Sequence, residues 1–96
     1  MTAGAITLPG TEPEAKVKAA KPARSILYND DWHTFDDVIA QLMKATGCSA
    51  EHGEAHAWTI HTVGKAVVFE GKREACEKVA QVLREIRLQV EVDWDD

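Results

Sequence analysis

The stretch from Ile26 to Phe35 constrains the fold most, because it joins a strand, a polar loop and the start of a helix. Residues 26–28 form an apolar run that is typical of a short buried strand. The run stops at residues 29–31, Asn-Asp-Asp, whose side chains bond to nearby backbone groups and so favour turns. Thr34 and Asp37 then have the spacing of a capping box, which predicts that a helix begins between them. A short polar loop is therefore expected to connect a strand to a helix.

This loop carries side chains that suit the binding of a cation beside an apolar pocket. It contains an amide, two carboxylates and the imidazole of His33, and the aromatic residues Trp32 and Phe35 lie next to them. Because the two aromatic residues fall outside the strand pattern, we expect at least one of their rings to border a pocket.

The rest of the chain predicts an α/β two-layer sandwich with the element order β-α-α-β-α-β. We expect strands at residues 25–29, 66–69 and 88–94, and helices at residues 35–46, 50–63 and 72–87. Gly47 and Gly64 are suited to ending the first two helices. The first strand is expected in the middle of a three-stranded antiparallel sheet, which places the polar loop near the end of the second helix.

Apolar positions in these elements predict the core. In the third helix they are expected to form one buried face at Ala75, Val79, Val82 and Ile86, with Cys76 and Leu83 flanking it. The large aromatic residues on apolar faces are also assigned to the core, namely Trp58, Phe69 and Trp94.

Charge and composition divide the chain into an extension, residues 1–24, and a domain, residues 25–96. The extension holds all three prolines and carries four basic against two acidic residues, so we expect a flexible tail. The domain carries seven basic and 14 acidic residues, which disfavours nucleic acid and favours amine-bearing partners. With no apolar run of membrane-spanning length and two cysteines outside any motif, we expect a cytoplasmic protein with reduced thiols.

No motif predicts an enzyme or a cofactor. The sequence has no nucleophile elbow, no phosphate-binding glycine loop and no dinucleotide fingerprint. Cys48, His52 and His56 are spaced to share one face of the second helix, and a thiolate with two imidazoles is suitable zinc chemistry. No fourth ligand is spaced to join them, so we favour ordinary surface residues and keep a metal site as an alternative.

Three segments together resemble the ClpS family. They are Leu27-Tyr28-Asn29-Asp30-Asp31-Trp32, Ile60-His61-Thr62-Val63-Gly64-Lys65-Ala66 and Lys78-Val79-Ala80-Gln81-Val82. The family comprises adaptors of the bacterial Clp protease that recognise N-degrons, and the resemblance covers residues 25–95. It implies a non-enzymatic adaptor for proteins with a free N-terminal Leu, Phe, Tyr or Trp, which docks on the N-terminal domain of a ClpA- or ClpC-type AAA+ unfoldase.

The resemblance also assigns roles to individual residues. The substrate's α-ammonium is expected at Asn29, Asp30, Asp31 and His61, since amide, carboxylate and imidazole groups can accept its protons. The first side chain is expected in a pocket formed by His33, Phe35, Val38, Ala57, Ile60 and Leu88. Unfoldase docking is expected at Glu74 and Lys78.

The sequence departs from the family pattern around the pocket. Phe35 and Ala57 stand where the family has methionines, and His33 stands where it has a threonine. We expect Phe35 to narrow the mouth and Ala57 to deepen the floor, which favours aromatic first residues. The alternative is a diverged regulator that docks on the unfoldase without binding N-degrons.

Overall fold

The computed structural model describes residues 21–95, and within them the chain forms the expected order of elements. The strands are β1 (Ala23–Tyr28), β2 (Lys65–Gly71) and β3 (Val90–Asp93). The helices are α2 (Phe35–Thr46), α3 (Ala50–Val63) and α4 (Arg73–Leu83), followed by the short 3-10 helix η1 (Arg84–Ile86). Residues 1–20 of the expected extension lie outside the described residues.

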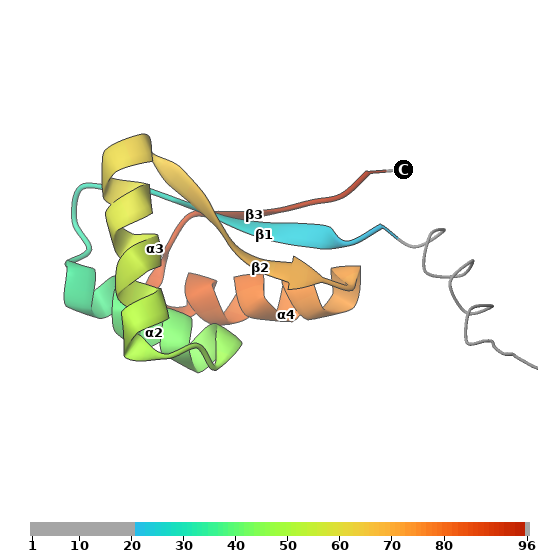
Figure 1. Cartoon of the computed structure of the whole chain (residues 1–96), viewed down its shortest axis with the longest axis horizontal. Coiled ribbons are helices and arrows are strands. Elements are labelled where there is room, and N and C mark those ends of the chain that lie inside the picture. Colours follow the sequence, from blue (N-terminus) through green and yellow to red (C-terminus); the bar gives the residue numbers. More distant parts are fainter. Residues whose placement is uncertain (1–20, 96) are drawn as a thin grey trace, which may run out of the picture.

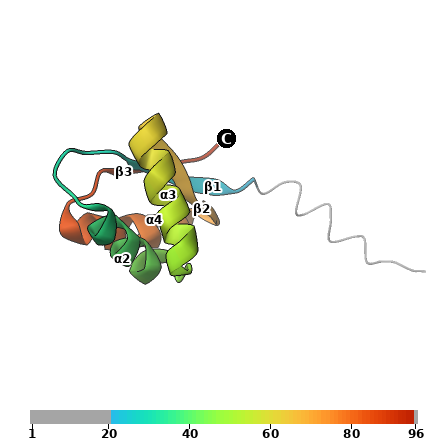
Figure 2. The same ribbon diagram turned by 60° about the vertical axis from the view of Figure 1, so that its left-hand side comes forward.

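The three strands form one sheet in the order β2-β1-β3, with β1 antiparallel to both neighbours. The helix α4 runs along one face of this sheet, while α2 and α3 gather at the end where β1 leaves it (Figure 1). A second view shows α2 beside both α3 and α4 (Figure 2). The predicted sandwich, with the first strand in the middle, is confirmed.

Local signals place the two helices next to the polar loop. Thr34 and Asp37 form the predicted capping box, because each side chain accepts a hydrogen bond from the other residue's backbone N–H. Gly47 ends α2 and Gly64 ends α3, both with positive φ angles of 74° and 106° that favour glycine. The cap at Thr34 and the stop at Gly64 are the two helix ends beside the polar loop, and Asn29 N–H of the loop donates to the carbonyl of Gly64.

Several predicted bounds were wrong, mostly at strand ends. The strand β1 begins at Ala23 and ends before Asn29, whose N–H instead donates to the carbonyl of Gly64 at 2.9 Å. The strand β2 extends beyond residues 66–69 in both directions because it pairs with the whole of β1. The strand β3 omits Leu88 and Gln89, which form the approach to the sheet after η1.

The third helix was predicted to continue to residue 87 but ends at Leu83. Its last turn tightens into η1, and Arg87 then adopts a left-handed φ of 65°, which turns the chain out of the helix. The buried face is also rotated from the predicted centre towards the two residues that were predicted to flank it, Cys76 and Leu83. Its buried residues are Cys76, Val79, Ala80 and Leu83.

The core lies between the sheet and the helices, and two predicted aromatic members do not belong to it. Its buried cluster includes Leu27, Leu42 and Leu83. Trp58 is 53% exposed and Trp94 is 38% exposed, whereas Phe69 packs against the cluster as expected. Trp94 lies beyond the end of β3, where its ring instead stacks under the guanidinium of Arg73 at 3.7 Å.

Candidate functional site

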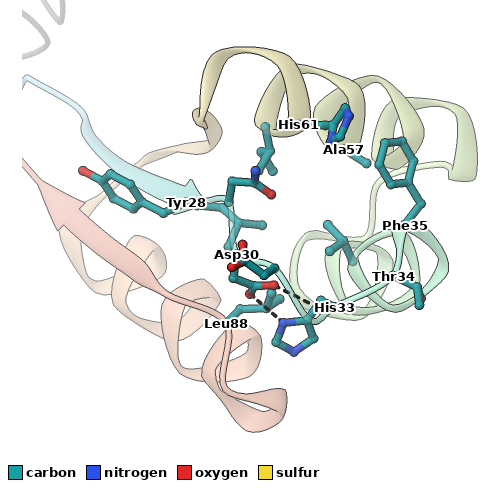
Figure 3. A pocket seen from close by; sticks show the side chains of 13 residues that line it. Tyr28, Asp30, His33, Thr34, Phe35, Ala57, His61 and Leu88 are labelled. Carbon is teal, nitrogen blue, oxygen red and sulfur yellow. Dashed lines mark hydrogen bonds and ion pairs between the residues drawn. The ribbon is translucent and has the colours of Figure 1, made fainter.

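A pocket of about 470 Å³ opens where β1 ends, between α2, α3 and the segment that follows η1. Every residue predicted for ammonium binding and every residue predicted for the apolar pocket lines this one cavity. Figure 3 shows Asp30, His61 and Phe35 around its open middle. Residues from four separate parts of the chain therefore meet at one site.

The backbone of the polar loop is fixed by its own carboxylate. One oxygen of Asp30, Oδ1, accepts the N–H groups of Trp32 at 3.1 Å and His33 at 2.9 Å. Burial raises the pKa of Asp30, but these hydrogen bonds and the imidazole of His33 outweigh it and hold the pKa below its ordinary value. Asp30 is therefore a charged acceptor held at the rim of the pocket.

The imidazole of His33 lies between two acceptors. Its Nδ1 is 2.6 Å from the second carboxylate oxygen of Asp30, Oδ2, and its Nε2 is 2.6 Å from the carbonyl oxygen of Ile86. Only 4% of the side chain is exposed. In Figure 3 the ring lies beneath Asp30, on the side away from His61. His33 lines the cavity, as the resemblance implied, and its ring also ties the loop to the end of η1.

The opposite rim is aromatic. The ring of Phe35 packs edge-to-face against two other rings. The distance between ring centroids is 4.9 Å to Trp58 and 5.6 Å to His61. Because His61 is in the last turn of α3 and Phe35 is the first residue of α2, this contact joins the two helices at the mouth of the pocket. The expectation that an aromatic residue borders a pocket is confirmed for Phe35.

The interior of the pocket is apolar. Ala57 and Ile60 from α3 are 3% and 4% exposed, and Leu88 is 4% exposed. Val38 from α2 packs against the same core. Arg87 has a left-handed φ angle and turns the chain back towards the end of β1, where Tyr28 N–H donates to the carbonyl of Gln89. This turn brings Leu88 into the lining of the cavity. The cavity thus combines a polar rim with an apolar interior.

Three lining residues were not predicted for the site: Leu27, Tyr28 and Thr34. Leu27 and Tyr28 end the strand that leads into the loop, so their place beside the cavity follows once the sheet order is known. The phenol of Tyr28 turns away and donates to Glu91 at 2.9 Å. Trp58, which was assigned to the core, does not line the cavity but packs on Phe35 at its mouth, because an apolar side chain on a helix gives the same signal whether it is buried or exposed.

The residues predicted for docking lie on a different part of the molecule. Glu74 and Lys78 are exposed on the first half of α4. This helix starts just after β2 ends at Gly71, and Gly71 pairs with Ala23 at the start of β1. The pocket lies beyond the other end of β1. The two predicted sites are therefore at opposite ends of the sheet (Figure 1).

Neither the alternative metal site nor a membrane segment is found in the described part of the chain. Within residues 21–95 no group of three histidine, cysteine, aspartate or glutamate side chains is arranged to hold a metal ion. Cys48, His52 and His56 therefore do not form a metal site in this structure. Across the same residues, no helix has the length and apolarity needed to cross a membrane.

The fold is shared with Agrobacterium tumefaciens ClpS2, whose structure has been determined bound to L-phenylalaninamide. The two structures align with a TM-score of 0.71 at 24% identity, over 76% of this chain and 95% of that one. The model of the ClpS family, described as the ATP-dependent Clp protease adaptor protein ClpS, matches residues 18–91. The chain therefore belongs to the ClpS family of Clp protease adaptor proteins.

Similarity also extends to eukaryotic ubiquitin ligases. The E3 ubiquitin-protein ligase UBR1 of Drosophila melanogaster is 40% identical over 55 residues, and human UBR2 is 33% identical over 58 residues. These matches cover 57% and 60% of this chain but 3% of each ligase, so the chain spans only a small part of the length of these relatives.

Proposed function

We propose that this chain is a non-enzymatic adaptor that captures proteins with a free, bulky apolar N-terminal residue and delivers them to a Clp AAA+ unfoldase in the cytoplasm. One observation carries the proposal: a single cavity has hydrogen-bond acceptors on its rim and apolar side chains inside. A charged α-ammonium next to a large apolar side chain is the ligand chemistry that such a cavity fits.

The rim offers acceptors for the three protons of an ammonium. The carboxylate of Asp30 is ionised, and Asn29, Asp31 and His61 line the same cavity. A charge-assisted hydrogen bond to a carboxylate is about twice as strong as a neutral one, so Asp30 is proposed as the main partner. The apolar interior then takes the first side chain. The ligand of Agrobacterium tumefaciens ClpS2, L-phenylalaninamide, has both of these groups and supports the proposal.

The test is the binding of short fluorescent peptides that start with Phe, Leu, Trp or Arg. Each is measured with a free and with an acetylated N-terminus by fluorescence anisotropy. We expect binding of about 10 μM or tighter for free Phe, and weaker binding of free Leu because Phe35 narrows the mouth while Ala57 leaves the floor open. Acetylation removes the charge and two donors, so binding should be lost.

Two outcomes would contradict this expectation. Equal affinity for peptides starting with Phe and Leu would refute the preference assigned to Phe35 and Ala57. Absence of binding to every free N-terminus would refute recognition itself and favour the diverged regulator, which docks on the unfoldase without capturing N-degrons.

We propose that delivery uses Glu74 and Lys78 on α4. Both are exposed at the end of the sheet away from the pocket, so a docked unfoldase leaves the mouth free. The double variant Glu74→Ala/Lys78→Ala should lose about tenfold or more in affinity for the N-terminal domain of a ClpA- or ClpC-type unfoldase, measured by interferometry. Its peptide binding should be unchanged. Unaltered docking of the double variant would move the proposed interface elsewhere.

A further inference from the structure

Trp58 is a large apolar side chain that the fold leaves uncovered beside the pocket. Its neighbour in the sequence, Ala57, is buried and lines the cavity, whereas Trp58 is 53% exposed and does not line it. The indole packs edge-to-face on Phe35, and its ring centroid is 6.1 Å from that of His61. Phe35 and His61 both line the cavity. The indole therefore extends the aromatic rim outwards, as an apolar surface next to the mouth.

The position of the ammonium determines the side on which a bound peptide leaves the cavity. Figure 3 shows Asp30 and Phe35 on opposite sides of its open middle. The bonds of the first Cα to its nitrogen and to its carbonyl carbon diverge by about 111°. With the ammonium at Asp30 and the first side chain inside, the carbonyl carbon points out of the cavity on the side of Phe35. The peptide then continues over this rim towards Trp58.

The spacing of side chains along a peptide brings one of them to the indole. In an extended chain the first and third side chains lie on the same face, about 6.6 Å apart, and the second lies on the opposite face. The first side chain fills the cavity up to Phe35, and the ring centroid of Trp58 is 4.9 Å beyond that of Phe35. The third side chain therefore comes down on the indole, while the second points into water.

We propose that Trp58 is a specificity-determining residue for the third residue of a captured protein, where it favours a large apolar side chain. This inference rests on the proposed function, because it requires a peptide that is held by its first residue. Contact with the indole removes apolar surface of both side chains from water, and this burial stabilises the complex. A small hydroxyl side chain such as serine buries less apolar surface and gains less.

The experiment uses short fluorescent peptides with a free N-terminal Phe, compared in two pairs. In one pair the third residue is Leu or Ser and the second is Ser. In the other pair the second residue is Leu or Ser and the third is Ser. Their affinities for the full-length chain are measured by fluorescence anisotropy, and the result is the ratio within each pair. This ratio is informative because any effect of a variant on the first residue cancels in it.

The variants are Trp58→Ala, which removes the ring, and Trp58→Phe, which keeps an aromatic ring. The matched control is Trp94→Ala. Trp94 is also partly exposed, but its ring stacks on Arg73 at the start of α4, at the end of the sheet away from the pocket. If Trp58→Ala is unfolded by circular dichroism, Trp58→Gln replaces it.

We expect the wild type and Trp94→Ala to bind the peptide with Leu at the third position about fivefold more tightly than the peptide with Ser there. Trp58→Phe should keep part of this preference, and in Trp58→Ala it should fall below about twofold. The pair that differs at the second position should give ratios within about twofold in every protein.

Equal third-position ratios in the wild type and Trp58→Ala would overturn the inference, whether both proteins prefer Leu or neither does. A ratio that depends on Trp58 at the second position alone would also overturn it. Failure of the proposed function gives a different result, in which no peptide with a free N-terminus binds, whatever its third residue.

Discussion

Replacing Asp30 with asparagine should weaken the binding of a peptide with a free N-terminal Phe by about a hundredfold, measured by fluorescence anisotropy near pH 7. The physical reason is that asparagine keeps the shape and one acceptor oxygen but removes the negative charge opposite the ammonium. Loss of the charged partner in a largely buried site costs about 3 kcal/mol, and the Asp30 side chain is only 18% exposed. Asparagine also retains the oxygen that accepts Trp32 N–H and His33 N–H, so the loop should keep its shape.

The matched control is Asp36→Asn, an exposed carboxylate in the first turn of α2 that does not line the pocket. It removes the same charge from the same part of the chain, so it reports the effect of net charge alone, and we expect a change of less than about twofold. A loss of less than about threefold in Asp30→Asn, with a thermal midpoint near that of the wild type, would show that other rim groups hold the ammonium.

The parts of the fold with strong local signals could be predicted from the sequence. The capping box at Thr34 and Asp37, and the glycines at 47 and 64, each determine a backbone geometry within a few residues. For this reason the bounds of α2 and α3 agree with the prediction. The first strand was also predicted in the middle of the sheet, which put the polar loop beside the end of α3, where Asn29 N–H donates to the carbonyl of Gly64.

The details that the sequence did not reveal depend on contacts between distant segments. The partner of His33 in η1 is the carbonyl of Ile86, a backbone group that no sequence pattern marks, so this hydrogen bond could not be predicted. The exposure of Trp58 depends on where α2 crosses α3, because its ring packs on Phe35 rather than under the sheet. Both contacts join segments that are far apart in the sequence, so local propensity does not reveal them.

Replacing Leu42 with alanine should lower the free energy of unfolding by about 3 kcal/mol, a large share of the stability of a domain of this size. Leu42 is fully buried and belongs to the core cluster, together with Leu27 and Leu83. Its truncation removes apolar contacts and leaves a cavity that the close-packed sheet and helices cannot fill. We expect the thermal midpoint to fall by about 15 °C, and urea unfolding should give the free energy directly.

The next residue on the same helix supplies the matched control for this loss. Met43 is 41% exposed, so Met43→Ala removes a similar number of atoms from a site that water already reaches, and it should cost less than about 1 kcal/mol.

The comparison also bears on the pocket, since α2 carries Phe35 and Val38 into its lining. If α2 and the pocket form one cooperative unit, Leu42→Ala should bind the Phe peptide normally well below its thermal midpoint and lose binding only as it unfolds. Weak binding by a folded Leu42→Ala protein would instead show that the core sets the shape of the pocket.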